Sequence, residues 1–282
     1  MLKQRVLTAI VLLVVLTATV SFDSNWPFFI FLSVACALAG WEWVRLTKSG
    51  PVMPIATGIF LAIATVSQAY NWEVQGQAQT NLVLLTTSVV ISAAIWVFVV
   101  LPTVFQGKSD APASSIVWTI FAPISLFSTW AVLAHLYSNH SVGYVLSLLI
   151  LIWIADIFAY FAGKAFGKTK LAPRISPGKT IEGAMAGIVG VVLWVIFTAI
   201  FWPASFGALL VKKWTLTGAV FLAVLLAIIS IAGDLFESLL KRRAGVKDSS
   251  SLLPGHGGVY DRIDAVVAVV PLAYLLTESL SL

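Results

Sequence analysis

Long uninterrupted apolar segments recur along the whole chain, and they constrain its fold more than any other feature. Each has roughly 17 to 25 residues, the length that an α-helix needs to cross the ~30 Å hydrocarbon core of a bilayer. The nine segments are 6–22, 26–46, 52–70, 82–101, 115–137, 142–163, 183–202, 214–236 and 259–279. They are continuous rather than alternating, so they do not fit a membrane β-barrel. The sequence predicts an all-α, polytopic integral membrane protein with about nine transmembrane helices.

Composition agrees with this fold class. Charged residues make up only 10% of the 282 residues, whereas an ordinary soluble domain carries about 25%. The first segment follows Lys3 and Arg5, as a signal peptide would, but no convincing cleavage site comes after it, so we expect it to stay as a span. The lone Cys36 lies within the second segment, which excludes a disulfide inside the chain.

The distribution of basic residues predicts the orientation. If the N-terminus is cytoplasmic and each span reverses the side, every Lys and Arg except Lys212 and Lys213 falls in the cytoplasm. We therefore expect a cytoplasmic N-terminus in the cell (inner) membrane, with cytoplasmic polar loops at 164–182 and 237–258. An N-terminal transmembrane region of about five helices would cover 1–140, and a catalytic transmembrane region of about four would cover 141–282.

Several carboxylates lie within or beside the apolar segments, where an ionised side chain is costly and therefore a functional candidate. Asp156 and Asp234 approach the cytoplasmic ends of their segments, and Asp261 and Asp264 open the last one. Glu42 is placed similarly, but flanking Trp residues and a nearby Arg are typical of an interfacial anchor. We expect Glu42 to be such an anchor, and we leave the role of Asp156 open.

The segment 238–264 concentrates cations between carboxylates, with a Gly-rich turn before the last helix. Asp234 and Glu237 share a helix face through their spacing of three, and Lys241 continues this face if the helix persists. Asp261 and Asp264 share the first turn of a helix, which attracts anions, so the crowded carboxylates require a cation. This mixture suits a divalent metal held together with a polyphosphate. Ion pairs within the protein are the alternative.

Two other motifs are weaker. Residues 176–180, Ser-Pro-Gly-Lys-Thr, resemble the end of a P-loop, but Pro173 replaces its first Gly and no strand is expected before it. We reject a P-loop, although Lys179 can still contact a phosphate or an anionic lipid. His256 has no second His or Cys at metal-ligand spacing, so zinc is not expected.

The same region resembles the signature of the phosphatidate cytidylyltransferase family (CDP-diacylglycerol synthases). The matching positions are Ser238, Lys241, Arg242, Lys247, Asp248, Pro254, His256, Gly257, Gly258, Asp261, Arg262 and Asp264. The segments 233–238 and 176–180 are also similar to that family. Ile154 departs from the small residue expected before Ala155 and Asp156.

The resemblance implies transfer of CMP from CTP to phosphatidate, which gives CDP-diacylglycerol and pyrophosphate. It also implies Mg²⁺, a homodimer, and a pair of metal-binding aspartates matching Asp234 and Asp261. From the chemistry we expect two metal ions, with Asp264 and Asp156 as further candidate ligands. We expect membrane lipid, and no nucleic acid, as a partner. The catalytic candidates are Asp234, Asp261, Lys241 and Asp264. The substrate- and phosphate-binding candidates are Arg242, Lys247, Asp248, His256, Gly257, Gly258, Arg262, Lys179 and Ser176.

Two other functions use similar residues. A CTP-dependent lipid kinase would transfer the γ-phosphoryl group to a lipid alcohol, and it would need a base for that hydroxyl. A secondary transporter would also carry charges within its spans, but near the midplane and often between inverted repeats. No repeat is visible in this sequence.

Overall fold

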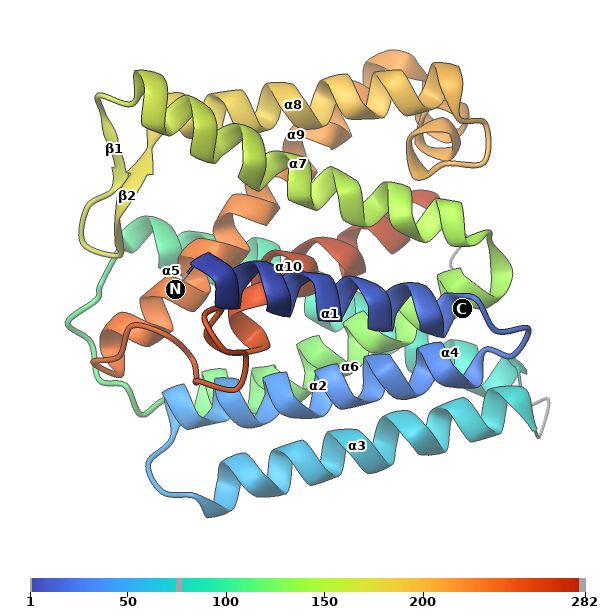
Figure 1. The fold of residues 1–282 in the computed structure, drawn as a ribbon, viewed down its shortest axis with the longest axis horizontal. Coiled ribbons are helices and arrows are strands. Elements are labelled where there is room, and N and C mark those ends of the chain that lie inside the picture. The colour runs from blue at the N-terminus through green and yellow to red at the C-terminus, as the bar shows by residue number, and fades with distance from the viewer. Residues whose placement is uncertain (1, 75–77, 279–282) are drawn as a thin grey trace.

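The computed structural model describes residues 2–74 and 78–278 and shows a bundle of long helices (Figure 1). The elements in chain order are α1 Leu2–Val20, α2 Trp26–Thr47, α3 Val52–Glu73, α4 Ala78–Ile95, the π-helical turn η1 Trp96–Val100, α5 Leu101–Gln106, α6 Ile116–Asn139, α7 Val142–Phe166, β1 Lys170–Ala172, β2 Ser176–Thr180, α8 Ile181–Phe201, α9 Phe206–Arg243 and α10 Tyr260–Thr277. All nine expected apolar segments coincide with helices among these residues, so the all-α fold class is confirmed.

Seven helices in the described ranges are long and apolar enough to cross a membrane. They are Trp26–Thr47, Val52–Glu73, Leu82–Gln106, Ile116–Asn139, Val142–Phe166, Ile181–Phe201 and Phe206–Arg243. The protein is thus a multi-pass membrane protein. The helices α1 and α10 are not among the seven, and α10 carries Asp261, Arg262 and Asp264 near its start. The count of nine spans and the orientation of the N-terminus stay predictions.

The first expected polar loop contains a small hairpin. Strands β1 and β2 pair antiparallel, with Lys170 opposite Thr180. Thr180 then begins α8 as its N-cap, because its side-chain oxygen accepts a hydrogen bond of 3.2 Å from the backbone N–H of Gly183. The carboxylate of Glu182 accepts hydrogen bonds from the backbone N–H groups of Lys168 and Thr169, which fixes the entry to the hairpin.

The second expected loop begins later than predicted. Helix α9 continues through Arg243, so the connection to α10 covers only 244–259. The helix persists because Leu235, Phe236, Leu239 and Leu240 continue its buried face beneath the charged residues. Near its other end α9 is interrupted at Thr215, which has a φ of 61°.

An aromatic cluster forms the core directly beneath the charged end of α9. Trp43 stacks on Tyr260 with ring centroids 4.8 Å apart and meets Phe236 edge-on at 5.6 Å. Trp96 also contacts Phe236, at 5.5 Å. These pairs join α2, η1, α9 and α10, and such contacts add about 0.5–1.5 kcal/mol each beyond area burial. Positions 42, 237 and 261, which directly follow or precede these aromatic residues, are therefore brought together.

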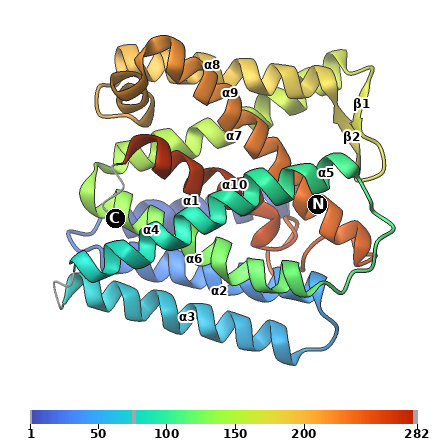
Figure 2. The same ribbon diagram turned by 180° about the vertical axis from the view of Figure 1, so that it is seen from behind.

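Figures 1 and 2 show α7 and α8 side by side along one side of the bundle, with the hairpin at one end. Small residues allow α7 and α8 to pack closely: a Cβ atom at Gly187 would lie 2.7 Å from the carbonyl oxygen of Ala155. Helix α10 passes through the middle of the bundle and packs against α9, α6 and α4 (Figure 2). This arrangement leaves the ends of α7, α9 and α10 facing one another near the hairpin.

Candidate active site

A cavity of about 920 Å³ lies among α7, the hairpin, α8, α9 and α10. Its charged lining residues come from segments that are far apart in the sequence. The carboxylates are Asp156, Asp234, Glu237, Asp248, Asp261 and Asp264, and the cations are Lys164, Lys179, Lys241 and Arg262. Because carboxylates outnumber cations on this wall, the cavity is suited to take up an additional positive charge.

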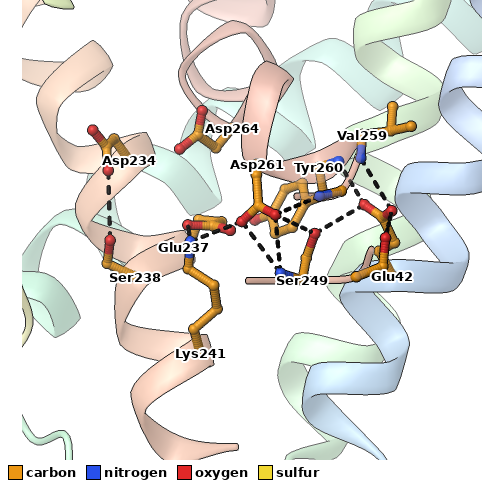
Figure 3. A network of polar contacts seen from close by, with 12 residues as sticks. Glu42, Asp234, Glu237, Ser238, Lys241, Ser249, Val259, Tyr260, Asp261 and Asp264 are labelled. Carbon is orange, nitrogen blue, oxygen red and sulfur yellow. Dashed lines mark hydrogen bonds and ion pairs between the residues drawn. The ribbon is translucent and has the colours of Figure 1, made fainter. Parts of the chain in front are cut away.

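Three of these carboxylates form a compact group. Asp234 and Glu237 come from one face of α9, Asp264 comes from α10, and one ligand atom of each lies within 4.8 Å of the others. Glu237 Oε1 is buried and has no hydrogen-bond partner. An unpaired buried acceptor is unfavourable, and carboxylate oxygens are the ligands that Mg²⁺ prefers. The group formed by Asp234, Glu237 and Asp264, called the acidic triad below, therefore fits a divalent cation (Figure 3).

Two lysines neutralise part of this charge. Lys179 Nζ forms an ion pair with Asp234 Oδ2 across the cavity. Lys241 Nζ lies 2.5 Å from Glu237 Oε2 and 2.8 Å from Asp261 Oδ1, so it bridges α9 and α10. Both ammonium groups line the cavity and carry charge that can contact the phosphates of a bound ligand.

Asp261 is held differently from the acidic triad. Besides Lys241, its carboxylate accepts hydrogen bonds from the backbone N–H of Gly258 at 2.7 Å and from the backbone N–H and hydroxyl of Ser249, both at 3.0 Å. Figure 3 shows Asp261 turned toward Ser249, while Asp264 lies nearer Asp234. The grouping in the structure thus differs from the predicted metal-binding pair of Asp234 and Asp261. Asp261 already has donors around it, whereas Glu237 has a free oxygen atom.

The other candidates fall into two sets. Ser176, Asp248, Arg262 and Asp156 line the cavity with the residues above. Arg242 is exposed, and its Nε atom donates a hydrogen bond of 3.1 Å to the carbonyl oxygen of Ile175, which ties α9 to the hairpin.

Apart from Asp248, the candidate residues of the connection 244–259 lie around the cavity rather than in it. Lys247 is exposed. His256 lines a neighbouring, mostly apolar cavity of about 600 Å³, which Arg262 also lines. Gly257 has a φ of 83° and precedes Gly258 in the turn that enters α10. The Gly-rich sequence before α10 predicted a turn, but it did not indicate which residues of the turn would line the cavity.

Glu42 is not the interfacial anchor that its neighbours indicated. Its side chain is fully buried, and so is that of Trp43, which belongs to the aromatic core. Arg45 does lie over the Trp41 ring, 5.0 Å from its centroid, as an anchor would. The carboxylate of Glu42 instead accepts hydrogen bonds from the connection 244–259 and from the start of α10. Sequence reasoning also missed its partners Ser249 and Ser250, for which a polar serine run was the only signal.

The model of the cytidylyltransferase family matches residues 3–280 of the chain. The chain belongs to this family. A phosphatidate cytidylyltransferase of Haemophilus influenzae is 36% identical over 286 residues, which cover 96% of each protein. Proteins of the same name from Pseudomonas aeruginosa and Thermotoga maritima are 35% and 33% identical over 274 and 284 residues, and these alignments cover at least 95% of every chain involved.

The resemblance drawn from the segments 176–180 and 233–264 is therefore confirmed, and it extends along the whole chain. A cytidylyltransferase moves a nucleotidyl group, and such transfer depends mainly on positioning and on neutralising phosphate charge. The cavity offers cations for phosphates and a group of carboxylates for a metal. The lipid kinase and transporter alternatives find no support in these comparisons.

Proposed function

We propose that this cytidylyltransferase is a phosphatidate cytidylyltransferase that uses CTP. A phosphate oxygen of phosphatidate attacks the α-phosphorus of CTP and forms a new P–O bond. The bond from that phosphorus to the oxygen bridging to the β-phosphate breaks, and pyrophosphate leaves with the electron pair. The products are CDP-diacylglycerol and pyrophosphate.

The observation that carries this proposal is the charged cavity at the hairpin end of a membrane-embedded bundle. The attacking oxygen belongs to an already ionised phosphate, so no side chain has to remove a proton from it. The main obstacle is repulsion between two anions. Lys179, Lys241 and Arg262 line one cavity and can hold phosphate groups of both substrates close together. A lipid kinase would need a base beside a lipid hydroxyl.

The acidic triad would hold Mg²⁺, and Asp156 on the facing wall would contribute to a second ion. When bound, these ions supply positive charge at the phosphates of CTP. Mg²⁺ keeps several of its waters and needs few protein ligands, which agrees with a group of three carboxylates. The protein's own contribution is to hold the carboxylates at a fixed separation on two packed helices.

The remaining parts of the proposal concern the cellular location of the protein, the side of the membrane that its site faces, and its oligomeric state. The site would face the cytoplasm, where CTP is available, with the protein in the inner membrane of a bacterial cell. This placement is supported by the Lys and Arg residues at the hairpin end. Five lie within 164–182, and the others are Lys241, Arg242 and Arg243 at the end of α9 and Lys247 just after it. A homodimer is also proposed, and mass measurement of the detergent-solubilised protein tests it.

The activity is tested with purified full-length protein, Mg²⁺ and phosphatidate, together with CTP labelled at either the α- or the γ-phosphate. We expect α-label in the lipid product and γ-label in pyrophosphate. Lipid that carries γ-label would indicate a kinase, and no label in lipid from either CTP would refute the proposal. Omission of phosphatidate and addition of excess EDTA are the controls, and both should abolish labelling of the lipid.

A further inference from the structure

Glu42 lies on α2, far in sequence from the residues that line the cavity. Its side chain nevertheless makes several polar contacts next to the cavity. Its carboxylate is fully buried. It accepts hydrogen bonds from the hydroxyl group of Ser250 at 2.5 Å and from that of Ser249 at 3.0 Å, whose single proton is shared between Glu42 and Asp261. It also accepts them from the backbone N–H groups of Val259 at 3.0 Å and Tyr260 at 2.6 Å. Figure 3 shows Ser249, Val259 and Tyr260 converging on the Glu42 carboxylate.

The two backbone contacts lie at the start of α10, which has no side-chain cap of its own. The first N–H groups of a helix have no partner within it and need an acceptor from elsewhere. Glu42 supplies that acceptor from another helix, and the positive end of the helix dipole stabilises its charge in return. Glu42 therefore acts as a remote N-cap of α10, in the same turn as Asp261 and one turn before Asp264, both of which line the cavity.

The other contacts of Glu42 lead directly to Asp261. The hydroxyl oxygen of Ser249 lies 3.0 Å from Glu42 Oε2 and 3.0 Å from Asp261 Oδ2. The backbone N–H of Ser249 donates a hydrogen bond to Asp261 as well. Since Asp261 in turn binds Lys241, a continuous set of contacts runs from α2 through the loop to α9.

Neighbouring side chains of α2 hold the same loop. Trp43 stacks on Tyr260, and one guanidinium nitrogen of Arg45 donates a hydrogen bond of 2.8 Å to the carbonyl oxygen of Ser249. A Cβ atom at Gly258 would lie 2.5 Å from both carboxylate oxygens of Glu42. The loop backbone is thus pressed against the carboxylate, and only glycine at 258 permits this approach.

We propose that Glu42 is a positioning residue of the enzyme: it caps α10 and fixes the loop 249–260, and so sets the positions of Asp261 and Lys241 in the cavity. This inference rests on the proposed function for its catalytic consequence. The capping of α10 itself does not depend on which reaction is catalysed.

The test uses Glu42→Gln in the full-length protein. Glutamine keeps the size of the side chain but replaces one acceptor oxygen with an amide donor that faces N–H and O–H donors. We expect kcat to fall by ~10²-fold, the loss typical of small misplacements near the reacting groups, while KM for CTP changes much less. Amide exchange in a peptide covering 249–262 should become faster. Glu73→Gln, on an exposed Glu that accepts a hydrogen bond from Asn25, is the matched control and should change neither quantity.

A double-mutant comparison separates positioning from general stability. If Glu42 acts through Ser249, then Glu42→Gln combined with Ser249→Ala should lower kcat little more than the stronger single change does. A multiplicative loss would indicate separate effects and overturn the inference. Wild-type kcat and wild-type exchange in Glu42→Gln would also overturn it.

If Glu42→Gln does not fold, Ser250→Ala removes one donor to Glu42 and should give the same changes to a smaller extent. Unchanged exchange and unchanged kcat in Ser250→Ala would then refute the inference. If wild-type protein does not transfer cytidylyl groups but Glu42→Gln still speeds exchange in 249–262, the proposed function fails while the capping role of Glu42 is upheld.

Discussion

Lys179 forms an ion pair with Asp234, which connects the hairpin β1–β2 to α9. Lys179 belongs to the Ser-Pro-Gly-Lys-Thr segment that resembles a P-loop in sequence, but the structure makes this segment a strand of a two-stranded hairpin. Its ammonium group therefore reaches the cavity from the hairpin, whereas that of Lys241 comes from α9. A phosphate chain bound in the cavity would meet cations from two separate elements.

Lys179→Ala should weaken the use of CTP. A hydrogen bond to a charged group contributes about 1.5–3 kcal/mol, so kcat/KM for CTP should fall by ~10- to 10²-fold. Lys170→Ala, on the exposed start of β1, should leave kcat/KM near the wild-type value. Steady-state kinetics at saturating phosphatidate provide the measurement, and equal losses in both variants would argue against a specific role for Lys179.

Asp234→Asn and Asp264→Asn should each lower kcat by at least ~10²-fold, because each removes a charged ligand from the acidic triad. Calorimetric titration of the purified variants with Mg²⁺ should show weakened binding in both. Asp110→Asn, on an exposed loop, is the control and should bind Mg²⁺ as the wild-type protein does. If Asp261→Asn lost Mg²⁺ binding while Asp264→Asn kept it, the metal would lie at the pair predicted from sequence and not at the triad.

Gly258→Ala should destabilise the protein and reduce its activity. The added methyl group would lie 2.5 Å from both carboxylate oxygens of Glu42, and overpacking of this kind costs about 1–3 kcal/mol. A Cβ atom at Gly178 would meet nothing within 4 Å, which makes Gly178→Ala a matched control. Thermal unfolding in detergent should show a lower midpoint for Gly258→Ala alone, and identical midpoints would contradict the packing described for the loop.

Single cysteines should report the orientation of the protein. Cys36 is buried, so Cys36→Ala provides a background without reactive thiols. In that background Lys168→Cys, near the hairpin, should react with an impermeant maleimide only from the cytoplasmic side of sealed vesicles. Lys212→Cys, near the start of α9, should react only from the other side. Labelling of both from the same side would refute the proposed orientation.

The helices could be predicted from sequence because apolar length is a local property. The segment 142–163 lies within α7, for example, and 26–46 within α2. The sequence did not decide whether α9 extends past Glu237. Lys241 shares a helix face with Glu237 only if the helix continues. Charged residues suggested a loop there, but buried leucines beneath them continued the helix.

The contacts of the site were less predictable than its residues. The signature segment named Asp234, Asp261, Asp264 and Lys241, and the structure places all four on one cavity. It could not indicate that Asp261 pairs with Ser249 while Glu237 joins Asp234 and Asp264, because that depends on how α9 and α10 cross. Glu42 was misread because its flanking tryptophans are a local signal, while its partner Tyr260 lies 218 residues away.

The contact between Glu42 and the loop also bears on how the enzyme is made. Synthesis reaches Glu42 first, and Ser249 follows 207 residues later. N-terminal parts of a chain generally fold first, so α2 enters the bilayer with a carboxylate whose partners do not yet exist, and such a charge is unfavourable in lipid. The carboxylate gains its hydrogen-bond donors only when the loop 244–259 and α10 have been synthesised and have packed against α2. A nascent chain that stops before residue 249 would lack all four donors that pair with this carboxylate in the finished protein.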